Sequence, residues 1–210
     1  MKLGIVLAGG TADRWNNYPK ELLPVGNGIT LLDRSISIMK DSGADKIMFM
    51  TNNYKEHIHR YMLKDSVDYF MRIGQRDIWY SIAESFIYDA DWNLYAMPDT
   101  YYPTDAFKDL CKNDFNIGWF KTYRPERFGV IYDSEILDKQ RLPVGQYQAW
   151  GVLAWSKKVV DFWNKHSEIT THTQAFNMAM AEFGFNMKEL KFYYDMASWD
   201  DYKEFIQGEI

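Results

Sequence analysis

Short apolar runs alternate with helix-like stretches through the first hundred residues, and this alternation is the feature that most limits the fold. Apolar strands are expected at residues 2–7, 46–51, 67–71 and 94–99, with helical periodicity between them at residues 30–42, 55–64 and 77–89. Strands that alternate with helices are typical of βαβ units, in which parallel strands are covered by helices on both faces. The sequence therefore predicts a three-layer α/β fold with a mostly parallel sheet.

The pattern changes after Phe115, where strand-like segments are separated only by turn residues. The segments FNIGWFKTY, FGVIYD, EILDK and YQAWGVLAW indicate a mixed, partly antiparallel addition to the sheet. Helices are then expected near residues 157–165 and 173–183, a strand at 190–194, and a closing helix from about Ser198. Because no repeat or linker-like tract interrupts the chain, we predict one domain over residues 1–210.

Composition limits the partners and the compartment. The net charge of −5 argues against nucleic acid as a partner, since proteins that bind the phosphate backbone usually carry a basic face. Cys111 is the one cysteine, so an internal disulfide is excluded and a reducing compartment is expected. The apolar run at the N-terminus is too short for a signal peptide or a spanning helix. We therefore expect a cytoplasmic protein without a membrane partner, and its oligomeric state stays open.

The first strand leads into a glycine turn with basic residues close by. The segment GIVLAGGTADRW places Gly9 and Gly10 after the strand, Arg14 four residues later, and Lys20 within ten residues of the turn. Backbone N–H groups in such a turn suit phosphate, and two fixed positive charges suit a polyphosphate. The segment lacks both the dinucleotide fingerprint and the P-loop signature. A plain tight turn with solvated cations is the alternative interpretation.

Two acidic residues follow predicted strands. Asp99 comes after LYAMP and Asp195 after KFYY, and in a parallel sheet both side chains are expected at the carboxyl edge. Two carboxylates that meet over a triphosphate are suitable ligands for Mg²⁺, which is usually bound by one or two carboxylates and phosphate oxygens. Either aspartate alone is more typical of a turn or a helix cap.

Several motifs resemble those of one enzyme family. The combination L-A-G-G-x-x-x-R and P-K-E-L-L-P-V, at residues 7–14 and 19–25, resembles the opening motifs of the sugar-1-phosphate nucleotidylyltransferases (NDP-sugar pyrophosphorylases). Weaker matches follow in the same order: Gln75 before a helix, M-P-D at 97–99, F-G-V at 128–130, E-I-L-D-K-Q at 135–140 and YDMASWDDYKEF at 194–205. The resemblance spans residues 2–205 and implies a Rossmann-like, nucleotide-diphospho-sugar transferase-like fold.

The resemblance also implies a role for each matching position. Arg14 faces the β and γ phosphates, Lys20 meets phosphate at the reacting centre, and Asp99 and Asp195 hold a catalytic Mg²⁺. Residues implied on the nucleotide side are Leu7, Ala8, Gly9, Gly10, Thr11, Gln75, Ser81 and Pro98. Residues implied on the acceptor side are Gly129, Asp138, Lys139 and Trp150, with Lys139 at the acceptor phosphate and Asp138 near its hydroxyls.

The sequence departs from the family pattern at several of these motifs. Ala12, Ser81 and Ala197 stand where the family has glycine, Gln140 replaces a proline, and Asp13 adds a negative charge beside the arginine. Alanine restricts the backbone more than glycine does and leaves less room beside a phosphate. The identities of the base and the acceptor therefore stay open.

The leading hypothesis is a Mg²⁺-dependent transferase that moves NMP from an NTP to a sugar 1-phosphate, releasing pyrophosphate and forming an NDP-sugar. One alternative is an enzyme similar to CTP:phosphocholine cytidylyltransferase, in which Trp150 and Tyr147 form an aromatic cage for a quaternary ammonium. Another is a catalytically silent sensor of nucleotides or sugar nucleotides, which the departures from the glycine motifs favour. A nicotinamide-dependent oxidoreductase lacks its fingerprint.

Overall fold

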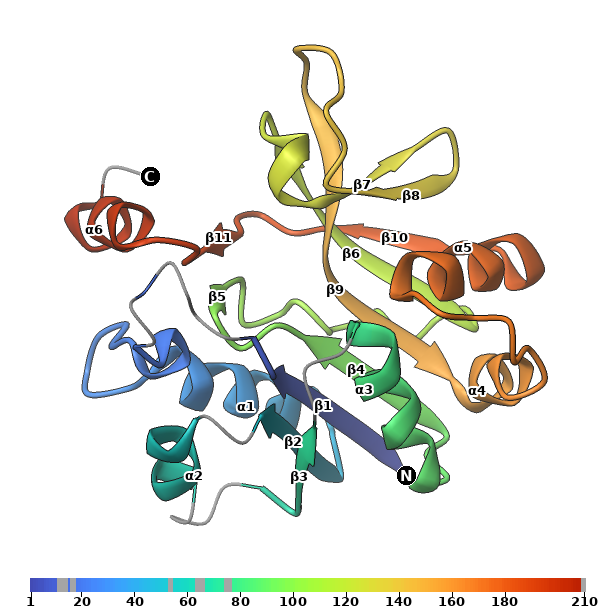
Figure 1. Cartoon of the computed structure of the whole chain (residues 1–210), viewed down its shortest axis with the longest axis horizontal. Helices are drawn as coiled ribbons and strands as arrows, with labels where there is room; N and C mark the ends of the chain where they lie inside the picture. The colour runs from blue at the N-terminus through green and yellow to red at the C-terminus, as the bar shows by residue number, and fades with distance from the viewer. Residues whose placement is uncertain (11–14, 16–17, 53–54, 63–66, 74–76, 209–210) are drawn as a thin grey trace.

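A computed structural model describes residues 1–10, 15, 18–52, 55–62, 67–73 and 77–208, and within them nine strands form the main sheet (Figure 1). Its path is β10-β6-β9-β4-β1-β2-β3. The bounds are β1 Lys2–Ala8, β2 Lys46–Asn52, β3 Tyr69–Ile73, β4 Trp92–Ala96, β6 Phe115–Thr122, β9 Tyr147–Ser156 and β10 Asn186–Glu189. Strands β3, β2, β1 and β4 are parallel, and β9 runs antiparallel to β4 and β6. The mixed, mostly parallel sheet predicted from the sequence is confirmed.

Two short strand pairs extend beyond this path. The hairpin of β7 (Gly129–Tyr132) and β8 (Glu135–Asp138) joins the sheet through β9. Strands β5 (Thr100–Tyr101) and β11 (Tyr194–Asp195) form a separate antiparallel pair. This pair joins the segment after β4 to the C-terminal part of the chain, as Figure 1 shows.

Helices cover both faces of the sheet, as the alternation of strands and helices predicts. Helices α3 (Ile78–Glu84), α4 (Lys157–Trp163) and α5 (His172–Phe183) pack in the same apolar cluster as Leu3, Ile5 and Leu7 of β1. Helices α1 (Leu31–Asp41) and α2 (Glu56–Met62) pack in the cluster that contains Val6 and Ala8. Successive residues of a strand point to opposite faces, so one strand contributes to two cores. Short 3-10 turns lie at Lys20–Leu22, Ser85–Ile87 and Pro125–Arg127.

Side-chain caps fix where the helices begin. Thr30 and Asp33 form a capping box at the start of α1, and each side chain bonds the other's backbone N–H, at 3.1 and 3.0 Å. Thr171 caps α5 by accepting from the N–H of Gln174 at 3.2 Å. Such caps satisfy N–H groups that lack partners within the helix. The cap on α5 fixes the backbone where this helix begins, at His172.

The C-terminal segment differs from its prediction. The strand expected at residues 190–194 is wrong, because the structure has β10 at Asn186–Glu189 and only Tyr194–Asp195 in β11. The aromatic residues between them are half-buried, and they are held by ring packing instead of strand pairing. Tyr193 stacks on Phe120 with 4.2 Å between ring centroids and fills the space above Gly151, where a Cβ would lie 2.7 Å from the ring. The segment leads into α6 (Trp199–Gln207), close to its predicted start.

Candidate active site

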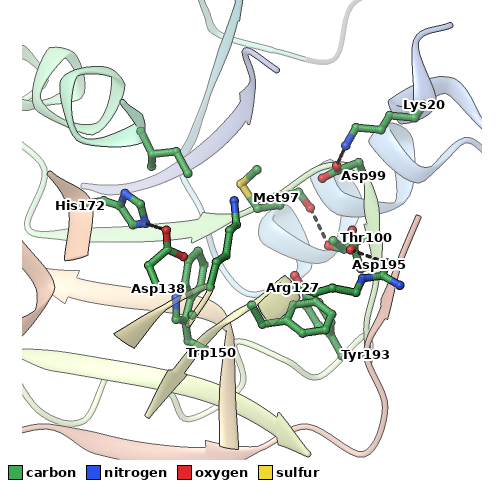
Figure 2. A pocket seen from close by; sticks show the side chains of 14 residues that line it. Lys20, Met97, Asp99, Thr100, Arg127, Asp138, Trp150, His172, Tyr193 and Asp195 are labelled. Atoms are coloured by element: carbon green, nitrogen blue, oxygen red, sulfur yellow. Dashed lines mark hydrogen bonds and ion pairs between the residues drawn. The ribbon is translucent and has the colours of Figure 1, made fainter. Parts of the chain in front are cut away.

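A pocket of about 180 Å³ lies beyond the carboxyl end of β4, where the main sheet meets the β5–β11 pair (Figure 2). Figure 2 shows Lys20, Asp99 and Asp195 at one end of the pocket and His172 and Asp138 at the other. The residues that line it are Lys20, Ile78, Met97, Asp99, Thr100, Arg127, Phe128, Gly129, Asp138, Lys139, Trp150, His172, Tyr193 and Asp195. Ligands of open α/β sheets bind at this position.

Asp99 and Asp195 line the same pocket, although the strand that carries Asp195 is not the one expected. Asp99 follows β4, as predicted, whereas Asp195 belongs to β11 and pairs with Thr100 across the antiparallel ladder. The N–H of Met196 donates to the carbonyl of Asp99 at 3.2 Å. The expectation that Asp195 ends a parallel strand is therefore wrong. The short β5–β11 ladder brings the two acids together.

The two carboxylates have opposite electrostatic surroundings. Burial acts to raise the pKa of Asp99, but the ion pair and hydrogen bond with the Lys20 ammonium lower it overall. Burial raises the pKa of Asp195, and the negative charge of Asp99 raises it further, although Arg127 acts in the opposite direction. Like charges in a low-dielectric site disfavour simultaneous ionisation. The pair of acids is therefore a place where a cation is stabilised.

Arg127 joins this pocket to helix α6. Its guanidinium donates to Asp195 Oδ2 at 3.0 Å and to both carboxylate oxygens of Asp201 at 2.9 and 3.1 Å. Asp201 is held in turn by the hydroxyl of Ser198, at 2.7 Å. A planar guanidinium suits such paired contacts with carboxylates. The sequence analysis missed Arg127, and its place directly before the F-G-V motif is the one signal that points to it.

The donor set fits the Mg²⁺ that the resemblance implies. Asp99 Oδ1 is buried and has no hydrogen-bond partner among the described residues, and its other oxygen bonds Lys20. An unsatisfied carboxylate oxygen beside a second carboxylate is the oxygen-rich environment that Mg²⁺ prefers. Within the described residues no group of three or more His, Cys, Asp or Glu is arranged to hold a metal. A magnesium ion here would take its remaining ligands from water and substrate phosphates.

A second buried ion pair, between Glu21 and Lys55, lies near the Lys20–Asp99 pair. Glu21 and Lys55 form a salt bridge with side chains 2% and 6% exposed. Burial raises the pKa of Glu21, while the Lys55 charge lowers it. Neither residue was singled out from the sequence. Glu21 lies within the P-K-E-L-L-P-V motif directly after Lys20, whereas nothing local marks Lys55.

On the acceptor side, the β7–β8 hairpin brings the predicted residues together. Gly129 pairs with Asp138 in the ladder, and the N–H of Lys139 donates to the carbonyl of Phe128 at 3.0 Å. The ring of Trp150 lies against Gly129 so closely that a Cβ there would be 2.2 Å from the indole nitrogen. All four predicted acceptor residues thus line the pocket.

The aromatic cage expected from Trp150 and Tyr147 is not assembled in this pocket. Trp150 lines it, but Tyr147 lines a different hollow with Trp119 and Tyr132, and its hydroxyl bonds the carbonyl of Pro143 at 2.7 Å.

The nucleotide side is described only in part. Leu7 and Ala8 are buried at the end of β1, and the Asn52 amide donates to the carbonyl of Gly9 at 2.8 Å and more weakly to that of Gly10, at 3.4 Å. Of the other residues expected here, Pro98 is buried beside Asp99, Ser81 is buried within α3 and does not line the pocket, and Thr11, Arg14 and Gln75 lie outside the described residues.

Comparison with solved structures supports this fold. The chain matches a Bacillus anthracis protein described as a glucose-1-phosphate thymidylyltransferase, at 19% identity and a TM-score of 0.79 over 98% of this chain and 94% of that one. It also matches the CTP:phosphocholine cytidylyltransferase LicC of Streptococcus pneumoniae, at 20% identity and a TM-score of 0.74 over 100% and 99%. The inositol-1-phosphate CTP transferase of T. maritima is similar at 16% identity and a TM-score of 0.70, over 96% and 91%. At these identities the matches show a shared fold.

The sheet topology and the solved structures that match it define a Rossmann-like α/β fold. No curated protein matches the chain. A family model does match it, over residues 4–141, and the chain belongs to the MobA-like NTP transferase domain family. None of the helices in the described residues has the length and apolar character needed to cross a bilayer.

Proposed function

We propose that this nucleotidyltransferase transfers NMP from an NTP to a sugar 1-phosphate, with Mg²⁺ as its cofactor. The observation that carries the proposal is the meeting of Lys20, Asp99 and Asp195 with the Asp138–Lys139 pair in one pocket. A charged end that suits a triphosphate and its metal thus faces an end that suits a phosphorylated acceptor. The family match and the names of the structural neighbours support a phosphate-bearing acceptor.

The reaction requires positioning and charge neutralisation more than covalent catalysis. An oxygen of the acceptor phosphate attacks the α-phosphorus of the NTP in line, forming a P–O bond while the bond to pyrophosphate breaks. Asp99 and Asp195 would hold Mg²⁺, which neutralises charge on the phosphates when bound. Lys20 lies beside these acids with its side chain only 16% exposed, so its ammonium stabilises negative charge more strongly than a fully exposed lysine would.

The acceptor end has features for both parts of a sugar phosphate. Lys139 supplies a positive charge for the phosphate, and Asp138 supplies acceptor oxygens for hydroxyl groups. Gly129 keeps the floor of this end open, since any larger residue would collide with Trp150.

Isotope exchange between pyrophosphate and NTP tests the proposal directly. The enzyme is incubated with Mg²⁺, each of the common NTPs, and glucose 1-phosphate, mannose 1-phosphate, myo-inositol 1-phosphate or phosphocholine. We expect Mg²⁺-dependent exchange with one NTP and a sugar 1-phosphate. Exchange with phosphocholine alone would overturn the acceptor assignment, and NTP binding in calorimetry without any product would indicate a silent sensor.

A matched pair of lysine variants connects the activity to the pocket. Lys20→Ala is expected to lower kcat by about 100- to 1,000-fold, the loss typical of removing one preorganised charge-stabilising group. Lys46→Ala is the control, because Lys46 also pairs with an aspartate, Asp68 at 2.9 Å, but lies exposed outside the pocket. Equal turnover in both variants would contradict the role of Lys20.

A further inference from the structure

His172 occupies the acceptor end of the pocket without a role assigned so far. It is the first residue of α5, it is 7% exposed, and it lines the pocket beside Asp138 (Figure 2). Buried histidines with one nitrogen toward a ligand pocket are common recognition groups, because the ring both donates and accepts.

One side of the ring is fixed by Asp77, the N-cap of α3. Asp77 Oδ1 accepts from the N–H of Trp79 at 2.8 Å and from the backbone N–H of His172 at 3.1 Å, and it lies 3.2 Å from His172 Nδ1. Burial acts to raise the pKa of Asp77, but these bonds lower it overall. An ionised carboxylate is only an acceptor, so the proton of the ring faces it at Nδ1.

The other nitrogen faces the pocket. His172 Nε2 lies 3.9 Å from Asp138 Oδ2, which is too far for a direct hydrogen bond. Both atoms are acceptors, because the ring proton is on Nδ1 and a carboxylate oxygen only accepts. Two neighbouring hydroxyl groups of a ligand can therefore each donate to one of them.

We propose that His172 is a specificity-determining residue, whose Nε2 accepts a hydrogen bond from one hydroxyl of the acceptor while Asp138 accepts from a neighbouring hydroxyl. The inference rests on the proposed function and names the acceptor class as a polyhydroxylated phosphate ester. Two hydroxyls on neighbouring carbons satisfy both partners, because each donates one hydrogen. The trimethylammonium group of phosphocholine has no hydrogen to donate, so it leaves Nε2 without a partner.

The surroundings of the ring leave Nε2 for the ligand. The charged groups around the ring are Asp77 from the start of α3, Asp138 at the end of β8 and Lys139 in the same pocket, and the ring packs on Phe176 of α5 itself. Asp77 accepts from Nδ1, so Nε2 and Asp138 both require a donor from the ligand. An acceptor substrate that presents two hydroxyl donors at this end is therefore expected to bind more tightly than one that presents none.

Two substitutions at this position separate recognition from structure. In His172→Asn the amide nitrogen takes the place of Nδ1 and keeps the bond to Asp77, but nothing replaces Nε2. In His172→Gln the amide oxygen takes the place of Nε2 and can still accept. His166→Asn is the matched control, because His166 also faces a carboxylate, Glu168 at 2.7 Å, but lies outside the pocket.

The assay is the rate of pyrophosphate release with the sugar 1-phosphate that serves best in wild type. We expect H172N to raise the KM for this acceptor by about tenfold, the cost of one hydrogen bond, with kcat within about twofold. We expect H172Q, whose amide oxygen can still accept, to keep a KM within about threefold of wild type, and H166N to match wild type.

A failure of this inference can be distinguished from a failure of the proposed function. Wild type that is active with a sugar 1-phosphate, together with a KM for H172N within about twofold of it, would overturn the inference and leave the proposed function standing. Wild type without activity on any hydroxylated acceptor would overturn the proposed function itself. Should H172N fold poorly in a thermal melt, the wild-type KM values for the sugar 1-phosphate and for its monodeoxy analogues decide, because equal values for all of them would also overturn the inference.

Discussion

Removing Lys55 is expected to destabilise the protein strongly without touching the pocket. Lys55 is the salt-bridge partner of Glu21, whose side chain is 2% exposed and whose second oxygen, Oε2, has no hydrogen bond among the described residues. Lys55→Met therefore leaves a buried carboxylate with no counterion, a change that typically costs about 3–5 kcal/mol. For a chain of 210 residues the lower figure corresponds to a Tm about 6–12 °C lower.

A double-mutant cycle in thermal and urea unfolding measures this effect. Replacing both partners, as in E21L/K55M, is expected to return stability to within about 1 kcal/mol of wild type, because an apolar pair has no buried charge to neutralise. If the double variant is no more stable than K55M, the loss comes from packing, and the electrostatic reasoning is refuted.

The pH dependence of the same variant gives a second check. Burial raises the pKa of Glu21, so the folded protein binds a proton at this site more readily than the unfolded chain does. For such a group stability falls as pH rises through the interval from the unfolded pKa to the folded one. Without the Lys55 charge, which lowers the pKa of Glu21, the folded-state pKa is higher, so the pH interval over which stability falls extends to higher pH. The difference in unfolding free energy between K55M and wild type should therefore shrink as pH is lowered from 8 toward 5.

Two further outcomes follow from the pocket. Asp195→Asn should raise the Mg²⁺ concentration needed for half-maximal activity by about tenfold or more, since it removes a charged ligand, and an unchanged magnesium titration would contradict a metal site here. Gly129→Ala should raise the acceptor KM and cost about 1–3 kcal/mol in urea unfolding, because its Cβ would lie 2.2 Å from the Trp150 indole nitrogen; Gly145→Ala, whose nearest contact is 3.6 Å, is the control. Equal behaviour of the two alanine variants would contradict this account of the pocket floor.

Much of the fold could be predicted because its information is local. The apolar period of residues 30–42 corresponds to α1, and the run at residues 46–51 corresponds to β2. The prediction failed at residues 190–194, where the aromatic residues resemble a strand but are half-buried by stacking on rings from distant segments. Sequence periodicity cannot distinguish a paired strand from an extended segment whose rings stack on other rings, because the side chains alternate between two sides in both.

The site could be predicted only where a local motif marks it. Lys20, Asp99 and the Asp138–Lys139 pair were found through motifs, and they line one pocket. His172 was missed, because its significance comes from Asp77 and Asp138, which are distant in sequence and meet it only after the helices pack on the sheet. Arg127 was missed for the same reason, since its partners lie on β11 and α6.

The two-residue strand β11 has a consequence for synthesis of the chain. Asp195 comes 96 residues after Asp99, and the ladder that joins their segments has only two residue pairs. A nascent chain that has emerged from the ribosome up to β9 already contains most of the sheet, together with Lys20 and Asp99, but not the second acid. Copies of the chain that stop before β11 therefore lack the second acid of the pocket, and under the proposed function they are expected to be inactive.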